Sequence, residues 1–106
     1  MRATLALAGL VALGVTAPVQ AQSAIEATMT KAGCLACHTK DKKLVGPAYK
    51  DVAAKYKGQA DAVAKLSEKV RKGGSGVYGP VPMPPTLADK ISDADLKTAI
   101  EWVLKQ

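Results

Sequence analysis

GCLACHTK, residues 33–40, contains both cysteines and the only histidine of this 106-residue chain. Cys34, Cys37 and His38 therefore lie together, and three chemistries use such a cluster: a metal site, a redox dithiol and the covalent attachment of a cofactor. A structural zinc site takes four protein ligands, whereas the Cys and His residues of this chain offer only three. A thioredoxin-like dithiol requires neighbouring strands, which the sequence does not predict. Covalent attachment is the interpretation that the sequence favours.

The spacing Cys-x-x-Cys-His is the attachment signal of c-type haem. Residues three positions apart lie on one face of a helical turn, so Cys34 and Cys37 can both reach the vinyl groups along one edge of a porphyrin. His38, the next residue, then brings its imidazole beneath the iron as the proximal ligand. We therefore predict one covalently bound haem c, with thioether bonds to both cysteines.

The first 21 residues predict a cleaved export signal. Arg2 supplies the positive start, residues 5–15 form an apolar run, and residues 19–21 read as a cleavage site. The run is too short to cross a bilayer, which requires about 20 residues. We expect residues 22–106 to form one domain in the periplasm, without a stable membrane anchor.

The charge of the mature chain predicts an acidic partner. Removal of Arg2 leaves 14 of the 15 basic side chains against 9 acidic ones, a net charge of +5. An exported chain without aromatic residues among its basic ones is not expected to bind nucleic acid. A soluble protein with an acidic docking surface fits better, and an anionic membrane surface or a merely solubilising role are the alternatives.

The mature chain is predicted to be all-α, with about four helices packed around the haem. Apolar side chains recur at helical spacing in residues 24–32, 49–57 and 61–72, and again in a last helix that begins after Ser92. Ser92 is the expected N-cap of that helix, with Ile91 and Leu96 as its hydrophobic staple. A chain with no Phe and one Trp has little bulk for a core, so a cofactor in the centre is expected to fill it.

The segment before the last helix, residues 73–91, contains four glycines and four prolines. Prolines restrict φ, and a stiff apolar loop of this length is expected to hold the cofactor in place. Met83 lies in this loop, whereas Met29 lies on the apolar face of the first helix and is expected in the core. Because the mature chain has no second histidine, we predict Met83 as the other axial ligand. Met/His ligation is typical of electron-transfer haems.

Three stretches of this chain resemble the short bacterial type of class I cytochrome c. They are GCLACH at 33–38, VGPAYKDVAAKY at 45–56 and GVYGPVPMPP at 76–85, and a terminal EWVLKQ follows them. The resemblance extends over residues 24–106. It implies that the first and last helices cross near one haem edge.

The same resemblance implies roles for three further residues. The carbonyl of Pro47 would accept the other N–H of His38, which fixes the orientation of the ring. Where the best-known members often have an arginine and a tryptophan near a haem propionate, this chain has Lys69 and Tyr78, which we expect to contact the propionate. Arg71 is the alternative to Lys69, although two residues further along a helix it is expected to point elsewhere. Trp102, on the last helix, is expected in the core rather than against the haem.

The resemblance finally implies a periplasmic electron carrier rather than an enzyme, expected to be a monomer. Nitrite reductase, a terminal oxidase and a quinol-oxidising cytochrome complex are the partners it suggests. Five lysines around the cysteines would steer such a partner: Lys31, Lys40, Lys42, Lys43 and Lys50. A haem protein with an open iron site and a docking domain held in a larger redox complex are the two alternatives.

Overall fold

The computed structural model describes residues 8–14 and 23–106. Its helices are α1 (Ser23–Lys31), η1 (Cys34–Ala36, a short 3-10 turn), α2 (Tyr49–Tyr56), α3 (Ala62–Lys72) and α4 (Asp93–Leu104). The described residues contain no strand, and only an isolated bridge pairs Gly74 with Met83. The all-α prediction is confirmed, and the three helices predicted with both bounds agree with the structure to within one residue at each end.

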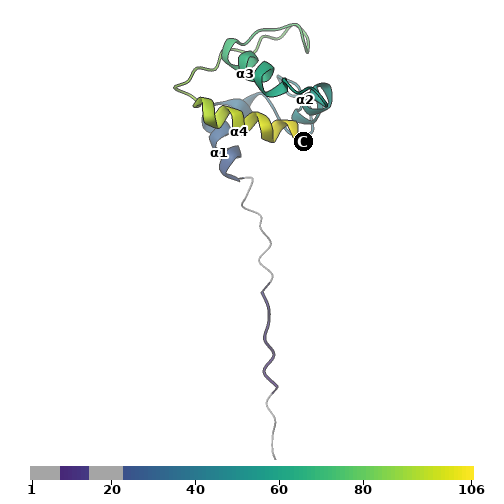
Figure 1. Ribbon diagram of the computed structural model, residues 1–106, viewed down its shortest axis with the longest axis vertical. Helices are drawn as coiled ribbons and strands as arrows, with labels where there is room; N and C mark the ends of the chain where they lie inside the picture. Colours follow the sequence, from purple (N-terminus) through teal and green to yellow (C-terminus); the bar gives the residue numbers. More distant parts are fainter. Residues whose placement is uncertain (1–7, 15–22) are drawn as a thin grey trace, which may run out of the picture.

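Helix α4 organises the fold because it contacts each of the other three α-helices (Figure 1). Its crossing with α1 agrees with the arrangement that the family resemblance implied. The core combines apolar side chains of α4 with others from α1, α2 and the segment before α4: Met29, Tyr49, Val52, Ile91, Leu96, Ala99, Ile100, Trp102 and Val103. The predictions that Met29 and Trp102 belong to the core are confirmed, since their exposed fractions are 2% and 9%.

The start of α4 follows the predicted capping pattern. The hydroxyl oxygen of Ser92 accepts a hydrogen bond from the backbone N–H of Asp95, at 3.2 Å. Ile91 and Leu96, the predicted staple, are both buried in the core. These local interactions set where α4 begins and therefore how the preceding loop enters the core.

The predicted export signal is described only in part. Residues 8–14 have no regular secondary structure, and Leu10, Val11 and Leu13 are exposed. The predicted cleavage site at 19–21 lies outside the described residues, so the export signal stays a prediction. Within 8–14 and 23–106, no helix is long and apolar enough to cross a membrane.

Candidate functional site

A cavity of about 250 Å³ lies between the helices. All four α-helices, η1 and the loop that contains Met83 contribute to its walls. Every residue predicted from the sequence to contact a cofactor lines this cavity: Cys34, Cys37, His38, Pro47, Lys69, Tyr78 and Met83. The fold thus brings together side chains that are spread over half of the chain.

The turn η1 presents the two cysteines and the histidine together. Gly33 begins the turn in the left-handed region, at φ 86°, and the carbonyl of Cys34 accepts hydrogen bonds from the N–H groups of Cys37 and His38, at 3.3 and 3.1 Å. The two thiols do not form a disulfide. Burial raises the pKa of the Cys34 thiol, because the thiolate would be poorly solvated.

The His38 imidazole is held by three neighbours. Its Nδ1 lies 2.8 Å from the carbonyl oxygen of Pro47, and a carbonyl can only accept, so Nδ1 carries a proton and Nε2 is the nitrogen that can offer a lone pair in the neutral ring. The ring stacks on Tyr49 with centroids 5.1 Å apart and an angle of 18° between the planes. Gly46 lies so close that an added Cβ would be 2.4 Å from Cε1 of His38. The imidazole therefore has a defined tautomer and orientation.

Met83 is fixed through its backbone to the segment that follows α3. Its N–H donates to the carbonyl of Gly74 and its carbonyl accepts from the Gly74 N–H, both at 2.9 Å. Gly73 ends α3 with φ at 68°, and a Cβ at that position would lie 2.3 Å from the carbonyl oxygen of Met83. Prolines directly precede and follow Met83, which restricts its backbone further. The thioether is thus carried by a stiff segment at the cavity wall.

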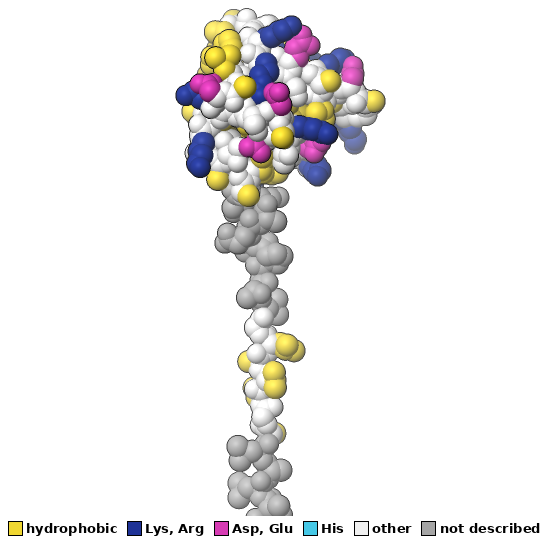
Figure 2. All heavy atoms as spheres, turned by 60° about the vertical axis from the view of Figure 1, so that its left-hand side comes forward, with side chains coloured by type: hydrophobic (Ala, Val, Ile, Leu, Met, Phe, Trp, Pro, Cys, Tyr) yellow, Lys and Arg dark blue, Asp and Glu magenta, His cyan; other side chains and the backbone are white. Residues whose placement is uncertain are grey.

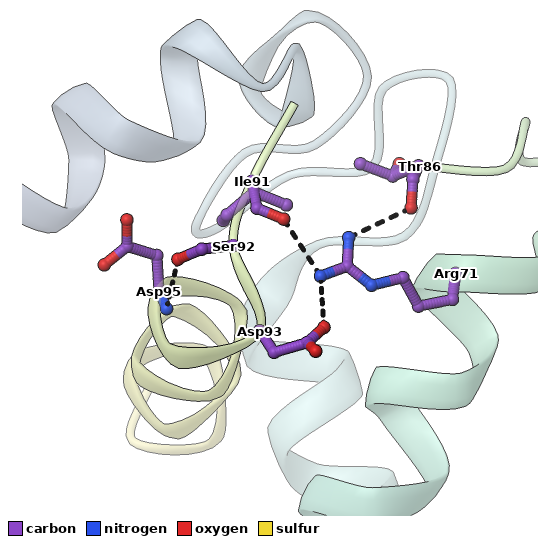
Figure 3. Close-up of polar contacts among 6 residues, drawn as sticks. All are labelled: Arg71, Thr86, Ile91, Ser92, Asp93 and Asp95. Atoms are coloured by element: carbon purple, nitrogen blue, oxygen red, sulfur yellow. Dashed lines mark hydrogen bonds and ion pairs between the residues drawn. The ribbon is translucent and has the colours of Figure 1, made fainter. Parts of the chain in front are cut away.

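Lys69 and Tyr78 both line the cavity, whereas Arg71 does not. The guanidinium of Arg71 instead donates to the carbonyls of Thr86 and Ile91 and to the Asp93 carboxylate (Figure 3). The structure therefore does not support Arg71 as the alternative to Lys69.

Tyr78 is 38% exposed, and the Nζ of Lys55 lies 5.9 Å from its ring centroid. Partial burial raises the pKa of Tyr78, with smaller contributions from Tyr56 and Asp51. The phenol consequently stays protonated in the neutral range and can donate a hydrogen bond towards the cavity.

The mouth of the cavity is apolar, and basic side chains lie on the surface of the domain. Val45, Val77 and Val81 line the cavity and are about half exposed. Figure 2 shows lysine and arginine side chains spread over the globular part, with acidic ones between them. Of the lysines expected to steer a partner, Lys43 lines the cavity, and Lys40 forms an ion pair with Glu26 at 2.9 Å.

The sequence alone indicated no role at the site for Tyr49 or Gly46, although both lie against the His38 ring. Arg71, the alternative considered for a propionate, contacts the loop before α4 instead. The sequence does contain one indication for Gly46: it directly precedes Pro47 and follows the Cys-x-x-Cys-His motif, so a close approach to His38 could have been expected. The contacts of Tyr49 and Arg71 depend on tertiary packing, and no spacing in the sequence indicates them.

The donor set fits a covalently attached haem better than an ion held by protein groups alone. The described residues contain no cluster of three or more His, Cys, Asp and Glu side chains that could bind a metal ion. Along one cavity they offer instead two free thiols, an imidazole with a free Nε2 and a thioether. Two attachment points and two axial donors are the groups that haem c requires.

Comparisons with known proteins agree with this chemistry. The family model of cytochrome c matches residues 23–106. A cytochrome c2 of Rubrivivax gelatinosus is 55% identical over 76 residues, which are 72% of this chain and 89% of that protein. A cytochrome c-551 of Pseudomonas aeruginosa is 54% identical over 74 residues, or 70% of this chain and 68% of that one. The crystal structure of Nitrosomonas europaea cytochrome c552 superposes with a TM-score of 0.70 at 45% identity and covers 76% of this chain and 96% of that chain.

Proposed function

The chain belongs to the cytochrome c family, and from this premise we propose that it is a periplasmic one-electron carrier in which His38 and Met83 bind the haem iron. Proteins of this family are small electron carriers, and membership implies one covalently attached haem c. When bound, the haem supplies the one-electron redox chemistry. The protein's residues supply attachment, orientation and the surface through which electrons pass.

One observation carries this proposal: a single cavity is lined by both thiols, by a histidine with a defined tautomer and by a methionine on a stiff segment. Cys34 and Cys37 would form the two thioether bonds. Pro47 would keep the Nε2 of His38 directed at the iron, and the Gly74 bridge would hold Met83 on the other side. Because both ligands are held by the fold, little has to move when the electron arrives or leaves.

Lys69 and Tyr78 are the proposed donors to a haem propionate. Both line the cavity, and both can donate a hydrogen bond, although lysine lacks the planar fork of arginine. The contacts of Arg71 with the loop before α4 favour Lys69 over Arg71 for this role.

The apolar mouth formed by Val45, Val77 and Val81 is the proposed site of electron exchange. Redox encounters of this kind bury little area, commonly below about 1,200 Å², and gain speed from complementary charges. The proposed partners are redox proteins with acidic docking surfaces, such as a nitrite reductase, a terminal oxidase or a quinol-oxidising cytochrome complex. The protein would meet them as a monomer.

Electron transfer is expected to depend on salt with a sign set by the charge of the reagent. An anionic one-electron reagent such as ferrocyanide should react fast at low salt and more slowly as ionic strength rises. A cationic one such as hexaammineruthenium should show the opposite trend, because the mature chain has 14 basic and 9 acidic side chains. Stopped-flow rates from about 10 mM to 0.5 M salt, over which the Debye length falls from roughly 30 Å to below 10 Å, would measure both trends. Equal, salt-independent rates would contradict electrostatic steering.

Gly46→Ala is expected to change the reduction potential through His38. The added methyl group would clash with the imidazole and lengthen its 2.8 Å contact with Pro47. That hydrogen bond increases the basicity of the ligand, so its loss should raise the potential. A hydrogen bond of about 0.5–1.5 kcal/mol corresponds to a rise of roughly 20–60 mV for one electron. Voltammetry of the purified protein would measure it.

Gly33→Ala is the matched control for this change. Gly33 has a left-handed φ of 86°, but a Cβ there would meet no atom within 4 Å. The control should therefore lower the free energy of unfolding by about 1–2 kcal/mol, through backbone strain alone, and leave the potential unchanged. An unchanged potential in Gly46→Ala would show that this glycine does not control the position of His38.

A further inference from the structure

Arg71 makes the largest set of side-chain hydrogen bonds around the loop that leads from Met83 to α4 (Figure 3). Its guanidinium donates to the carbonyl of Thr86 at 3.2 Å, to the carbonyl of Ile91 at 2.9 Å and to the Asp93 carboxylate at 2.7 Å. The side chain is only 22% exposed. One side chain of α3 thus contacts the loop at Thr86 and at Ile91, and it also contacts Asp93, the first residue of α4.

The loop that Arg71 holds continues directly from Met83. Thr86 lies three residues after Met83, and its N–H also donates to the carbonyl of Val70, at 2.9 Å. On the other side, Met83 pairs with Gly74 through two hydrogen bonds. The segment is therefore hydrogen-bonded to the C-terminal end of α3 and the glycines after it at two points, at Met83 itself and at Thr86, and Arg71 adds the charged hydrogen bonds.

The geometry of these contacts requires an arginine. A planar guanidinium can donate to several acceptors at fixed angles, whereas an ammonium is a point charge on a flexible stem. Hydrogen bonds with an ionised partner are about twice as strong as neutral ones, and partial burial of Arg71 limits their screening by solvent. Asp93, which is 92% exposed, contributes less than the two carbonyls because water competes for its carboxylate.

We infer that Arg71 is a positioning residue that keeps Met83 at the cavity by clamping the loop between Met83 and α4. Without the clamp, the loop is attached to α3 only through backbone hydrogen bonds near Thr86 and Met83. The bridge between Gly74 and Met83 then opens more often, and Met83 is displaced more readily by another ligand. This inference rests on the proposed role of Met83, but its effect on the backbone can be measured independently of that role.

Amide hydrogen exchange in the haem-loaded protein tests the clamp directly. In Arg71→Lys and Arg71→Met, the amides of Gly74 and Met83 are expected to exchange roughly 10- to 100-fold faster, the effect of losing charged hydrogen bonds. The amide of Tyr49, which donates to Thr39 and not to any residue of the loop, should keep its rate. Lys72→Met is the matched control, because Lys72 is exposed and pairs only with Glu68 on the surface of α3.

Carbon monoxide binding to the reduced protein provides the second readout. Its rate should rise by a similar factor in both Arg71 variants, rise less in Asp93→Asn, and stay at the wild-type value in Lys72→Met. Unchanged exchange at Gly74 and Met83 in the Arg71 variants would overturn the inference. Equally faster exchange at Tyr49 would also overturn it, since Arg71 would then serve only global stability.

Different results would contradict the proposed function and the inferred role of Arg71. A wild-type protein without a sulfur-to-iron absorption band would remove Met83 from the iron and so contradict the proposed function, while hydrogen exchange would still test the clamp. A wild-type protein with the band, and Arg71 variants that match it in exchange and carbon monoxide binding, would contradict the clamp alone. If Arg71→Met does not fold, Arg71→Lys carries the same test with the same expected effect, and Asp93→Asn carries it with a smaller one.

Discussion

The double variant Cys34→Ala/Cys37→Ala is expected to lose all of its haem on denaturation, whereas the wild-type chain should keep one haem. The two thiols are the only cysteines of the chain, so no other thioether can form. The effect should extend to the fold. Without haem, the apolar side chains that line the cavity would face water, and the burial that the haem provides would be lost. Because a small domain has only about 5–15 kcal/mol of stability in all, this loss should be enough to destabilise the fold severely.

Mass spectrometry of the denatured chains and far-ultraviolet circular dichroism would measure these two losses. The single variants Cys34→Ala and Cys37→Ala are the controls, because each keeps one thiol on η1 and should retain haem through one bond. A double variant that still carries a haem mass after denaturation would show that attachment does not use this motif.

Met83→Ala is expected to lower the reduction potential and open one position on the iron. A thioether ligand favours the reduced state, and axial ligands set haem potentials over a range of roughly 0.8 V, so the fall should be on the order of a few tenths of a volt. The reduced variant should bind carbon monoxide at once, since no other histidine exists to replace Met83. Voltammetry and the optical spectrum with and without carbon monoxide would measure both effects.

Met29→Leu is the matched control for Met83→Ala. Met29 is buried in the core on α1, at 2% exposure, and a leucine has nearly the same volume. This variant should lose at most about 1.5 kcal/mol of stability and keep the wild-type potential. If Met29→Leu changed the potential as much as Met83→Ala, the axial ligand would have been assigned to the wrong methionine.

Local patterns predicted most of the fold. Apolar spacing located the helices to within one residue, and the side chain of Ser92 caps α4 as its capping box indicated. Such features depend on neighbours in the chain, so they can be read from the sequence. The contact of α4 with α1 was implied by the family resemblance and not by spacing, and its contacts with α2 and α3 were not predicted.

The candidate site was predicted unevenly. Cys34, Cys37 and His38 are a contiguous motif, and Met83 followed by elimination because few donors exist. Arg71 was considered for a propionate only because it lies two residues after Lys69, and the sequence could not indicate its actual acceptors, which are carbonyls 15 and 20 residues further along the chain. Gly46 has no unusual φ, and its importance appears only once the His38 ring lies against it.

The most direct test of the account is an optical spectrum of the purified wild-type protein, first oxidised, then reduced, then with carbon monoxide. The account predicts a weak far-red sulfur-to-iron band in the oxidised form and no prompt change when carbon monoxide is added to the reduced form. Both results would place Met83 on the iron opposite His38. The absence of the band together with prompt carbon monoxide binding would mean an open iron site, and the electron-carrier assignment would give way to ligand chemistry.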